Sequence, residues 1–182
     1  MIRTFIAIDI KVVKKIIEIL EEIEKCDANI KLLEPEKLHI TLKFLGDTEK
    51  EKIEDIKKII KQSIKDIKPF KIKLANTGVF PNKNYIKVLW IGIKNPAELI
   101  KISEKINVNL AEIGFNVDKR KFSPHLTIAR LKSAKNKDKI LNILKKYENI
   151  EFCEFKVNSI KLMKSELTSK GPIYTTLKET KI

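Results

Sequence analysis

The chain contains only two histidines, His39 and His125, and both occur in the same short pattern. Residues 39–42 read HITL, and residues 125–128 read HLTI. Imidazole is the side chain whose unperturbed pKa, about 6.5, lies nearest neutrality, so two of them can divide general acid and general base work. The repeated pattern therefore predicts one site that uses both histidines.

Each pattern has the alternation of a β-strand, in which successive side chains point to opposite faces. His39 and Thr41 then share one face of the first strand, and His125 and Thr127 share one face of the second. The aliphatic residues between them point the other way, into a core. Lys43 is predicted on the same face as His39 and Thr41, where it either reaches a phosphate or is a solvated lysine.

Two imidazoles and two hydroxyls in one groove suit the cleavage of a phosphodiester. One imidazole can take a proton from water while the other protonates the leaving oxygen, which typically contributes ~10²–10⁴-fold. The threonine hydroxyls can hold the non-bridging oxygens. A ribose 2′,3′-cyclic phosphate, with its strained leaving group, needs little more, and no metal or other cofactor is demanded.

Two alternatives stay open for the same histidines. A metal site could combine both with a distant carboxylate, although no third histidine or carboxylate cluster lies beside either motif. Ser123 could act as a nucleophile beside His125, although no strand-turn-helix nucleophile elbow accompanies it.

Three further residues are candidates for substrate binding. Strict alternation places Arg130 opposite His125, so it contacts substrate only if its strand twists or ends there. Phe5 and Trp90 could each stack on a terminal base, as aromatic residues do in single-strand binders, or belong to the core.

Composition bounds the class of protein. The chain has 182 residues, which fits one domain over 1–182, and no apolar run is long enough to span a bilayer. Its net charge of +14 favours a polyanionic partner, nucleic acid first, or reflects plain solvated lysines. Cys26 and Cys153 show no metal-type spacing and suggest a cytoplasmic protein with reduced thiols. We expect a monomer that needs no protein partner and no membrane.

Strands alternate with helices along the chain, which predicts an α+β or α/β fold with helices packed on the sheets. Thr48 and Glu51 form a capping-box pattern that predicts the start of a helix. Strands are predicted over 2–9, 29–33, 38–45, 70–78, 84–93 and 122–131, helices over 12–23, 49–67, 96–113 and 137–147, and two or three strands after that.

The sequence resembles the two-histidine phosphoesterase superfamily, and within it the RNA 2′,3′-cyclic phosphodiesterases that are also called 2′-5′ RNA ligase-like proteins. The resemblance covers nearly the whole chain. It is carried by RTFIAI at 3–8, HITLKFLG at 39–46, GVFP at 78–81, LWIG at 89–92, FSPHLTIAR at 122–130, and SEL at 165–167 followed by GPIY at 171–174.

The resemblance implies a bilobal α+β fold of two mostly antiparallel sheets, with helices on their outer faces, pseudo-twofold halves and a central cleft. It implies metal-independent hydrolysis of an RNA 2′,3′-cyclic phosphate to a 2′-phosphomonoester. His39 would be the proton donor and His125 the proton acceptor, while Thr41 and Thr127 would hold the phosphate. Substrates would be RNA ends or small cyclic nucleotides. The alternatives are reversible 2′-5′ ligation of tRNA halves and a non-catalytic RNA- or nucleotide-binding module.

Overall fold

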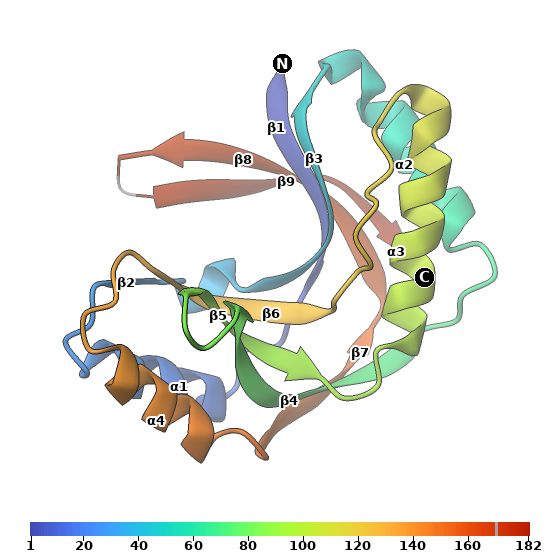
Figure 1. Ribbon diagram of the computed structural model, residues 1–182. Coiled ribbons are helices and arrows are strands. Elements are labelled where there is room, and N and C mark those ends of the chain that lie inside the picture. The colour runs from blue at the N-terminus through green and yellow to red at the C-terminus, as the bar shows by residue number, and fades with distance from the viewer. Residues whose placement is uncertain (170) are drawn as a thin grey trace.

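The computed structural model describes residues 1–169 and 171–182, and it contains two antiparallel sheets (Figure 1). The four-stranded sheet has the order β3-β1-β8-β9, and the five-stranded sheet has the order β2-β6-β5-β4-β7. The strands are β1 Ile2–Asp9, β2 Ile30–Leu32, β3 His39–Thr48, β4 Phe70–Pro81, β5 Ile86–Ile93, β6 His125–Leu131, β7 Glu151–Val157, β8 Ser159–Thr168 and β9 Gly171–Lys181.

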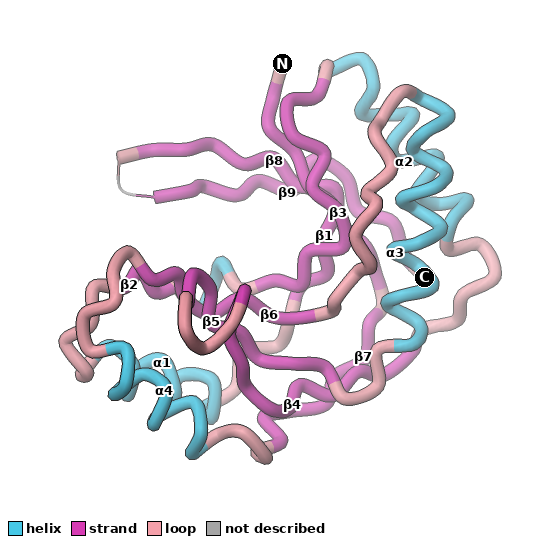
Figure 2. The backbone as a smooth tube through the Cα atoms, in the orientation of Figure 1, coloured by secondary structure: helices cyan, strands magenta, loops and turns pink. Residues whose placement is uncertain are grey.

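The helices cover the outer faces of the sheets because each carries one apolar stripe (Figure 2). α1 (Lys14–Glu24) and α4 (Lys137–Lys146) pack on the five-stranded sheet, and α2 (Ile53–Ser63) and α3 (Ala97–Asn109) pack on the four-stranded sheet. Short 3₁₀ turns lie at Pro35–Lys37, Lys50–Lys52 and Leu110–Ile113. No helix within 1–169 or 171–182 is long and apolar enough to cross a membrane.

The chain passes repeatedly from one sheet to the other. β1 belongs to the four-stranded sheet, yet the helix that follows it covers the five-stranded one, and α3 makes the opposite crossing. The two strands that carry the histidine motifs, β3 and β6, contact each other across the junction of the sheets. The predicted α+β architecture, with antiparallel sheets and outer helices, is confirmed.

The capping-box prediction at Thr48 is wrong. Thr48 is the last residue of β3, and its buried hydroxyl bonds the hydroxyl of Thr4 at 2.7 Å and donates to the Gly46 carbonyl at 3.2 Å. Helix α2 begins later, at Ile53, after a 3₁₀ turn whose end supplies no side-chain cap. The Thr48 hydroxyl bonds Thr4 on the neighbouring strand β1, so it does not cap the helix as the sequence pattern predicted.

Candidate active site

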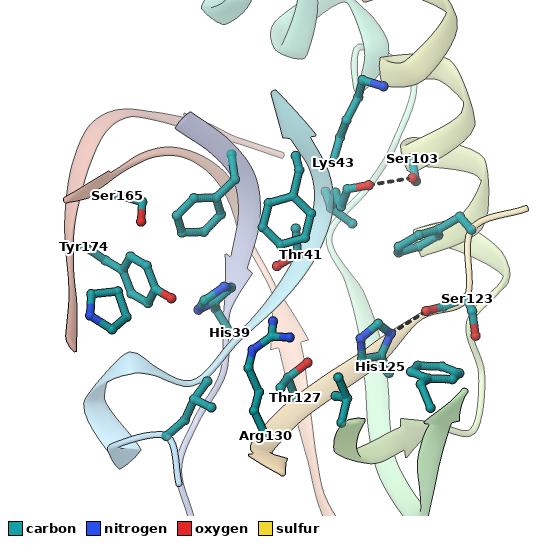
Figure 3. Close-up of a pocket in the computed structure, with 18 of the residues that line it drawn as sticks. His39, Thr41, Lys43, Ser103, Ser123, His125, Thr127, Arg130, Ser165 and Tyr174 are labelled. Atoms are coloured by element: carbon teal, nitrogen blue, oxygen red, sulfur yellow. Dashed lines mark hydrogen bonds between the residues drawn. The ribbon is translucent and has the colours of Figure 1, made fainter. Parts of the chain in front are cut away.

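The two histidine motifs line one cavity of about 1310 Å³ between the sheets. His39 and Thr41 come from β3, and His125 and Thr127 come from β6 (Figure 3). The structure therefore brings together the four residues that the repeated pattern singled out. Neither threonine hydroxyl has a hydrogen-bond partner in the part of the chain that the structure describes, so both are free to donate to a ligand.

Both imidazoles are anchored in the same way. Nδ1 of His39 lies 2.7 Å from the carbonyl oxygen of Lys37, and Nδ1 of His125 lies 2.7 Å from that of Ser123. A carbonyl oxygen can only accept, so each Nδ1 carries a hydrogen and donates it. Nε2 is then the nitrogen that gains or loses a proton, and it is left free for a ligand.

Aromatic rings pack against both imidazoles. The Phe5 ring lies 4.9 Å from the His39 ring, and Tyr174 meets His39 edge-on at 5.1 Å and 87°. Phe80 meets His125 edge-on at 4.9 Å and 81°. These contacts fix the ring planes and remove water from one side of each imidazole. Tyr174 and Phe80 were not predicted as site residues, although both lie in segments that carry the family resemblance.

Burial lowers the pKa of both histidines from the usual 6.5, because the charged form loses water. The hydrogen bonds to Lys37 and Ser123 raise both pKa values, and the Arg130 guanidinium lowers both. The two sites differ in one respect: the carboxylate of Asp9, the cross-strand partner of His39, raises the pKa of His39 alone. Asp9 itself pairs with Lys161.

Each motif strand contains a bulge just after its threonine. In β3, Thr41 pairs with Ala7 but Lys43 pairs with Ile6, which leaves Leu42 without its own partner. In β6, the register slips in the same way between Thr127 and Ala129 (paired with Trp90 and Leu89). A bulge adds one residue to one strand, so every later side chain changes face relative to strict alternation.

The bulge overturns the prediction that Lys43 shares the face of His39 and Thr41. Lys43 instead shares the buried face of Ile6 and is only 4% exposed. Its ammonium donates to Asn107 Oδ1 at 2.6 Å, to the Asn116 carbonyl at 3.0 Å and to Asp118 Oδ2 at 2.8 Å. Figure 3 shows the side chain turned toward α3 and away from His39.

The same slip brings Arg130 to the face of His125, where strict alternation did not place it. Arg130 pairs with Val88, and its exposed side chain lines the cavity. In Figure 3 it reaches between His39 and Thr127. Since it lowers the pKa of both histidines, its charge lies within reach of both imidazoles.

Neither aromatic residue proposed for base stacking is placed as an open platform. Phe5 is 2% exposed, because it packs beneath His39 and against Phe44. Trp90 lies over Gly78 and beside the Phe80 ring at 5.3 Å, and it does not line the cavity. Phe44 lines the cavity, as the buried Phe5 does, but is 65% exposed. The bulge in β3 turns Phe44 to this face, which strict alternation could not indicate.

The donor groups offer little to a metal ion. Among residues 1–169 and 171–182, no three histidine, cysteine, aspartate or glutamate side chains gather closely enough to hold one. The carboxylate that acts on His39, that of Asp9, is already paired with Lys161.

Two antiparallel sheets around one cavity, each contributing a His-x-Thr strand, define a class of phosphoesterase. This chain belongs to the two-histidine phosphoesterase family. The sequence model of one protein family, the AKAP7 2′5′ RNA ligase-like domain, matches its residues 5–182.

Two of its relatives match over nearly their full length. A protein of Methanocaldococcus jannaschii named RNA 2′,3′-cyclic phosphodiesterase is 44% identical over 182 residues, covering 97% of this chain and 99% of its own. One of the same name from Methanothermobacter thermautotrophicus is 35% identical over 176 residues, covering 96% and 95%. A crystal structure from Thermus thermophilus has a TM-score of 0.83 at 25% identity, covering 98% of this chain and 97% of its own. Escherichia coli LigT, solved with 3′-AMP, shares the fold, with a TM-score of 0.72 at 23% identity, covering 100% and 98%.

Proposed function

We propose that this protein hydrolyses the 2′,3′-cyclic phosphodiester at the end of an RNA and leaves a 2′-phosphomonoester and a free 3′ hydroxyl. The observation that carries the proposal is the matched pair of imidazoles, each fixed through Nδ1 and free at Nε2, in one cavity. The names of the full-length relatives point to the same reaction.

The reaction needs one proton removed and one delivered on opposite sides of the phosphorus. Neutral His125 accepts a proton at Nε2 from a water molecule, whose oxygen forms the new bond to phosphorus. The bond from phosphorus to the 3′ oxygen breaks, and protonated His39 delivers its Nε2 proton to that oxygen. Because both proton transfers come from imidazoles, we propose that no metal takes part.

The donor role is given to His39 by the family resemblance, and one contact agrees with it. Asp9 faces His39 across the β1–β3 ladder and raises its pKa, whereas no carboxylate acts on His125. Thr41, Thr127 and Arg130 supply donors for the non-bridging oxygens, where negative charge must be held during displacement.

A product analysis tests the proposal. The protein is stripped of metal with a chelator and incubated with a short RNA that ends in a 2′,3′-cyclic phosphate. We expect hydrolysis, with the phosphate retained on the 2′ oxygen. Binding without turnover would instead support a non-catalytic RNA-binding module. Turnover that appears only after a divalent metal is restored would support the metal alternative and contradict the imidazole scheme.

We further infer that residues 1–182 form one domain that works as a monomer in a reducing compartment. The repeated crossing of the chain between sheets supports a single folding unit, because neither lobe is a continuous segment. The two free thiols, Cys26 and Cys153, support the reducing compartment. One cooperative unfolding transition, unchanged by reductant, is the expected result.

A further inference from the structure

A segment without regular secondary structure, residues 115–124, leads from the 3₁₀ turn after α3 to the second histidine motif. We name it the basic loop. It carries Lys119, Arg120 and Lys121, which are all exposed and all line the cavity. Within the described residues, no ion pair or side-chain hydrogen bond engages any of the three. Their charges are therefore available to a ligand.

The part of the basic loop just before Lys119 is held by the buried ammonium group of Lys43. Lys43 binds Asp118 and the Asn116 carbonyl. Asn107 of α3 reinforces this anchor, since its Oδ1 accepts from Lys43 Nζ and from the Asp118 backbone N–H at 2.9 Å, and its Nδ2 donates to the Asp118 carbonyl at 3.2 Å. A loop whose backbone is already held next to its binding residues loses less conformational entropy when those residues bind a ligand.

The basic loop is thereby tied to the first motif as well as the second. Lys43 reaches it because the bulge in β3 turns this side chain toward α3, where Ser103 Oγ also bonds the carbonyl of the bulged Leu42 at 2.9 Å. The loop then runs into Ser123, whose carbonyl holds His125. The backbone that carries its cations is therefore tied to both histidine motifs.

The cavity is larger than the reacting group requires. Small-molecule pockets usually have volumes of about 300–1,000 Å³. The volume here, about 1310 Å³, exceeds that range, although catalysis as proposed needs only one phosphate between the histidines. Two of the cavity's three acidic lining residues are paired, Glu34 with Lys37 and Asp118 with Lys43, and the third is Glu104 of α3. The charged groups of the basic loop that have no partner among the described residues are all positive.

We propose that Lys119, Arg120 and Lys121 bind the backbone phosphates that precede the terminal cyclic phosphate, and that Lys43 positions them. The inference rests on the proposed function and adds to it a preference for polynucleotide ends over cyclic mononucleotides. An RNA strand offers the basic loop phosphates that 2′,3′-cyclic CMP lacks. The selectivity is electrostatic and independent of base sequence.

The test compares two substrates and two matched variants. The variant Lys119→Ala/Arg120→Ala/Lys121→Ala is measured beside Lys61→Ala/Lys65→Ala/Lys68→Ala, which removes the same charge from exposed positions of α2 and the turn after it. Each is assayed on 2′,3′-cyclic CMP and on a short RNA ending in a cyclic phosphate. We expect the loop variant to lose kcat/KM on RNA at least about tenfold more than on cyclic CMP. Its kcat/KM for RNA should also depend less on salt, since each phosphate contact contributes a slope of about −0.7.

The positioning role of Lys43 is tested with two variants, Lys43→Met and Asn107→Ala. If one of them fails to fold, the other still tests the role. Each should raise KM for the RNA more than KM for cyclic CMP, with a smaller change in kcat. Equal KM changes on both substrates would overturn the positioning role, and equal losses in the loop and α2 variants would overturn the docking site. A wild-type protein that hydrolyses neither substrate would instead contradict the proposed function itself.

Discussion

Phe44 and Arg130 occupy equivalent positions in the two motifs, because each is the third residue after its threonine and each strand bulges in between. Both side chains line the cavity. The two lobes thus present matching histidines and threonines but different neighbours, an exposed aromatic ring from one and a cation from the other. The two motifs therefore differ in the groups that they present to a ligand beside the matched histidines.

The pH dependence of the wild-type enzyme should reflect the lowered pKa values of both histidines. The active free enzyme has His39 protonated and His125 neutral, and both pKa values lie below 6.5. We therefore expect kcat/KM to peak below pH 6.5. A bound phosphodiester anion favours both charged forms, so kcat should peak at higher pH. Coincident optima, or a kcat/KM optimum above neutrality, would contradict this account.

Removing the charge of Arg130 should move the profile upward in pH. Arg130 lowers both pKa values, so Arg130→Gln raises both, and each limb of the kcat/KM profile shifts to higher pH. The height of the profile should fall about 10–100-fold, since a charged hydrogen bond contributes about 1.5–3 kcal/mol. The control is Lys132→Gln, an exposed lysine on the same segment that does not line the cavity. An unshifted pH profile in Arg130→Gln would mean that the Arg130 charge does not act on the pKa of either histidine, which would contradict this prediction.

The threonine hydroxyls should matter for the phosphate and not for the fold. Thr41→Val and Thr127→Val keep the β-branched shape, and neither hydroxyl has a protein partner among the described residues. Each variant should lose about 10–100-fold in kcat/KM because a donor to a charged oxygen is removed. Thr175→Val, at an exposed position of β9 outside the cavity, is the matched control. Full activity in either motif variant would assign that hydroxyl no part in binding.

The packing of Trp90 on Gly78 should be measurable as stability. A methyl group at Gly78 would overlap the indole atoms Cζ2 and Cη2 of Trp90, so Gly78→Ala should lower the free energy of unfolding by about 1–3 kcal/mol. A phenylalanine ring lacks those atoms, so the cost of Gly78→Ala should shrink in a Trp90→Phe background. Urea unfolding of the four proteins gives the comparison, and a cost that is the same in both backgrounds would contradict the predicted overlap.

The residue pattern alone located the centre of the site but not its surroundings. His39, Thr41, His125 and Thr127 were found because a scarce residue type recurs in one strand pattern. The faces of Lys43 and Arg130 were mispredicted because each lies beyond a bulge.

Those bulges depend on contacts that are distant in sequence. The Ser103 hydroxyl donates to the bulged Leu42 carbonyl, and the Leu33 N–H donates to the bulged Ile128 carbonyl, each at 2.9 Å. No local signal in either strand encodes such partners.

The fold was also predicted in part: the order of its elements was predicted correctly, but some local polar contacts were not. The order of strands and helices followed from apolar periodicity, since each helix buries one stripe and each strand alternates. Local polar signals were less reliable, because a buried hydroxyl bonds whichever partner the tertiary structure brings. Thr48 matched a helix cap in sequence but bonds Thr4 of the adjacent strand.

The central claim is that His39 and His125 act together on one phosphorus atom, and the most direct measurement is the turnover of a cyclic-phosphate RNA by His39→Ala, His125→Ala and the double variant. Each single variant should lose ~10²-fold or more while keeping its fold by circular dichroism. Groups that work as a unit show strongly non-additive losses, so the double variant should be little slower than the slower single one. Losses that multiply in the double variant, or near-normal turnover in either single variant, would contradict a shared acid–base pair.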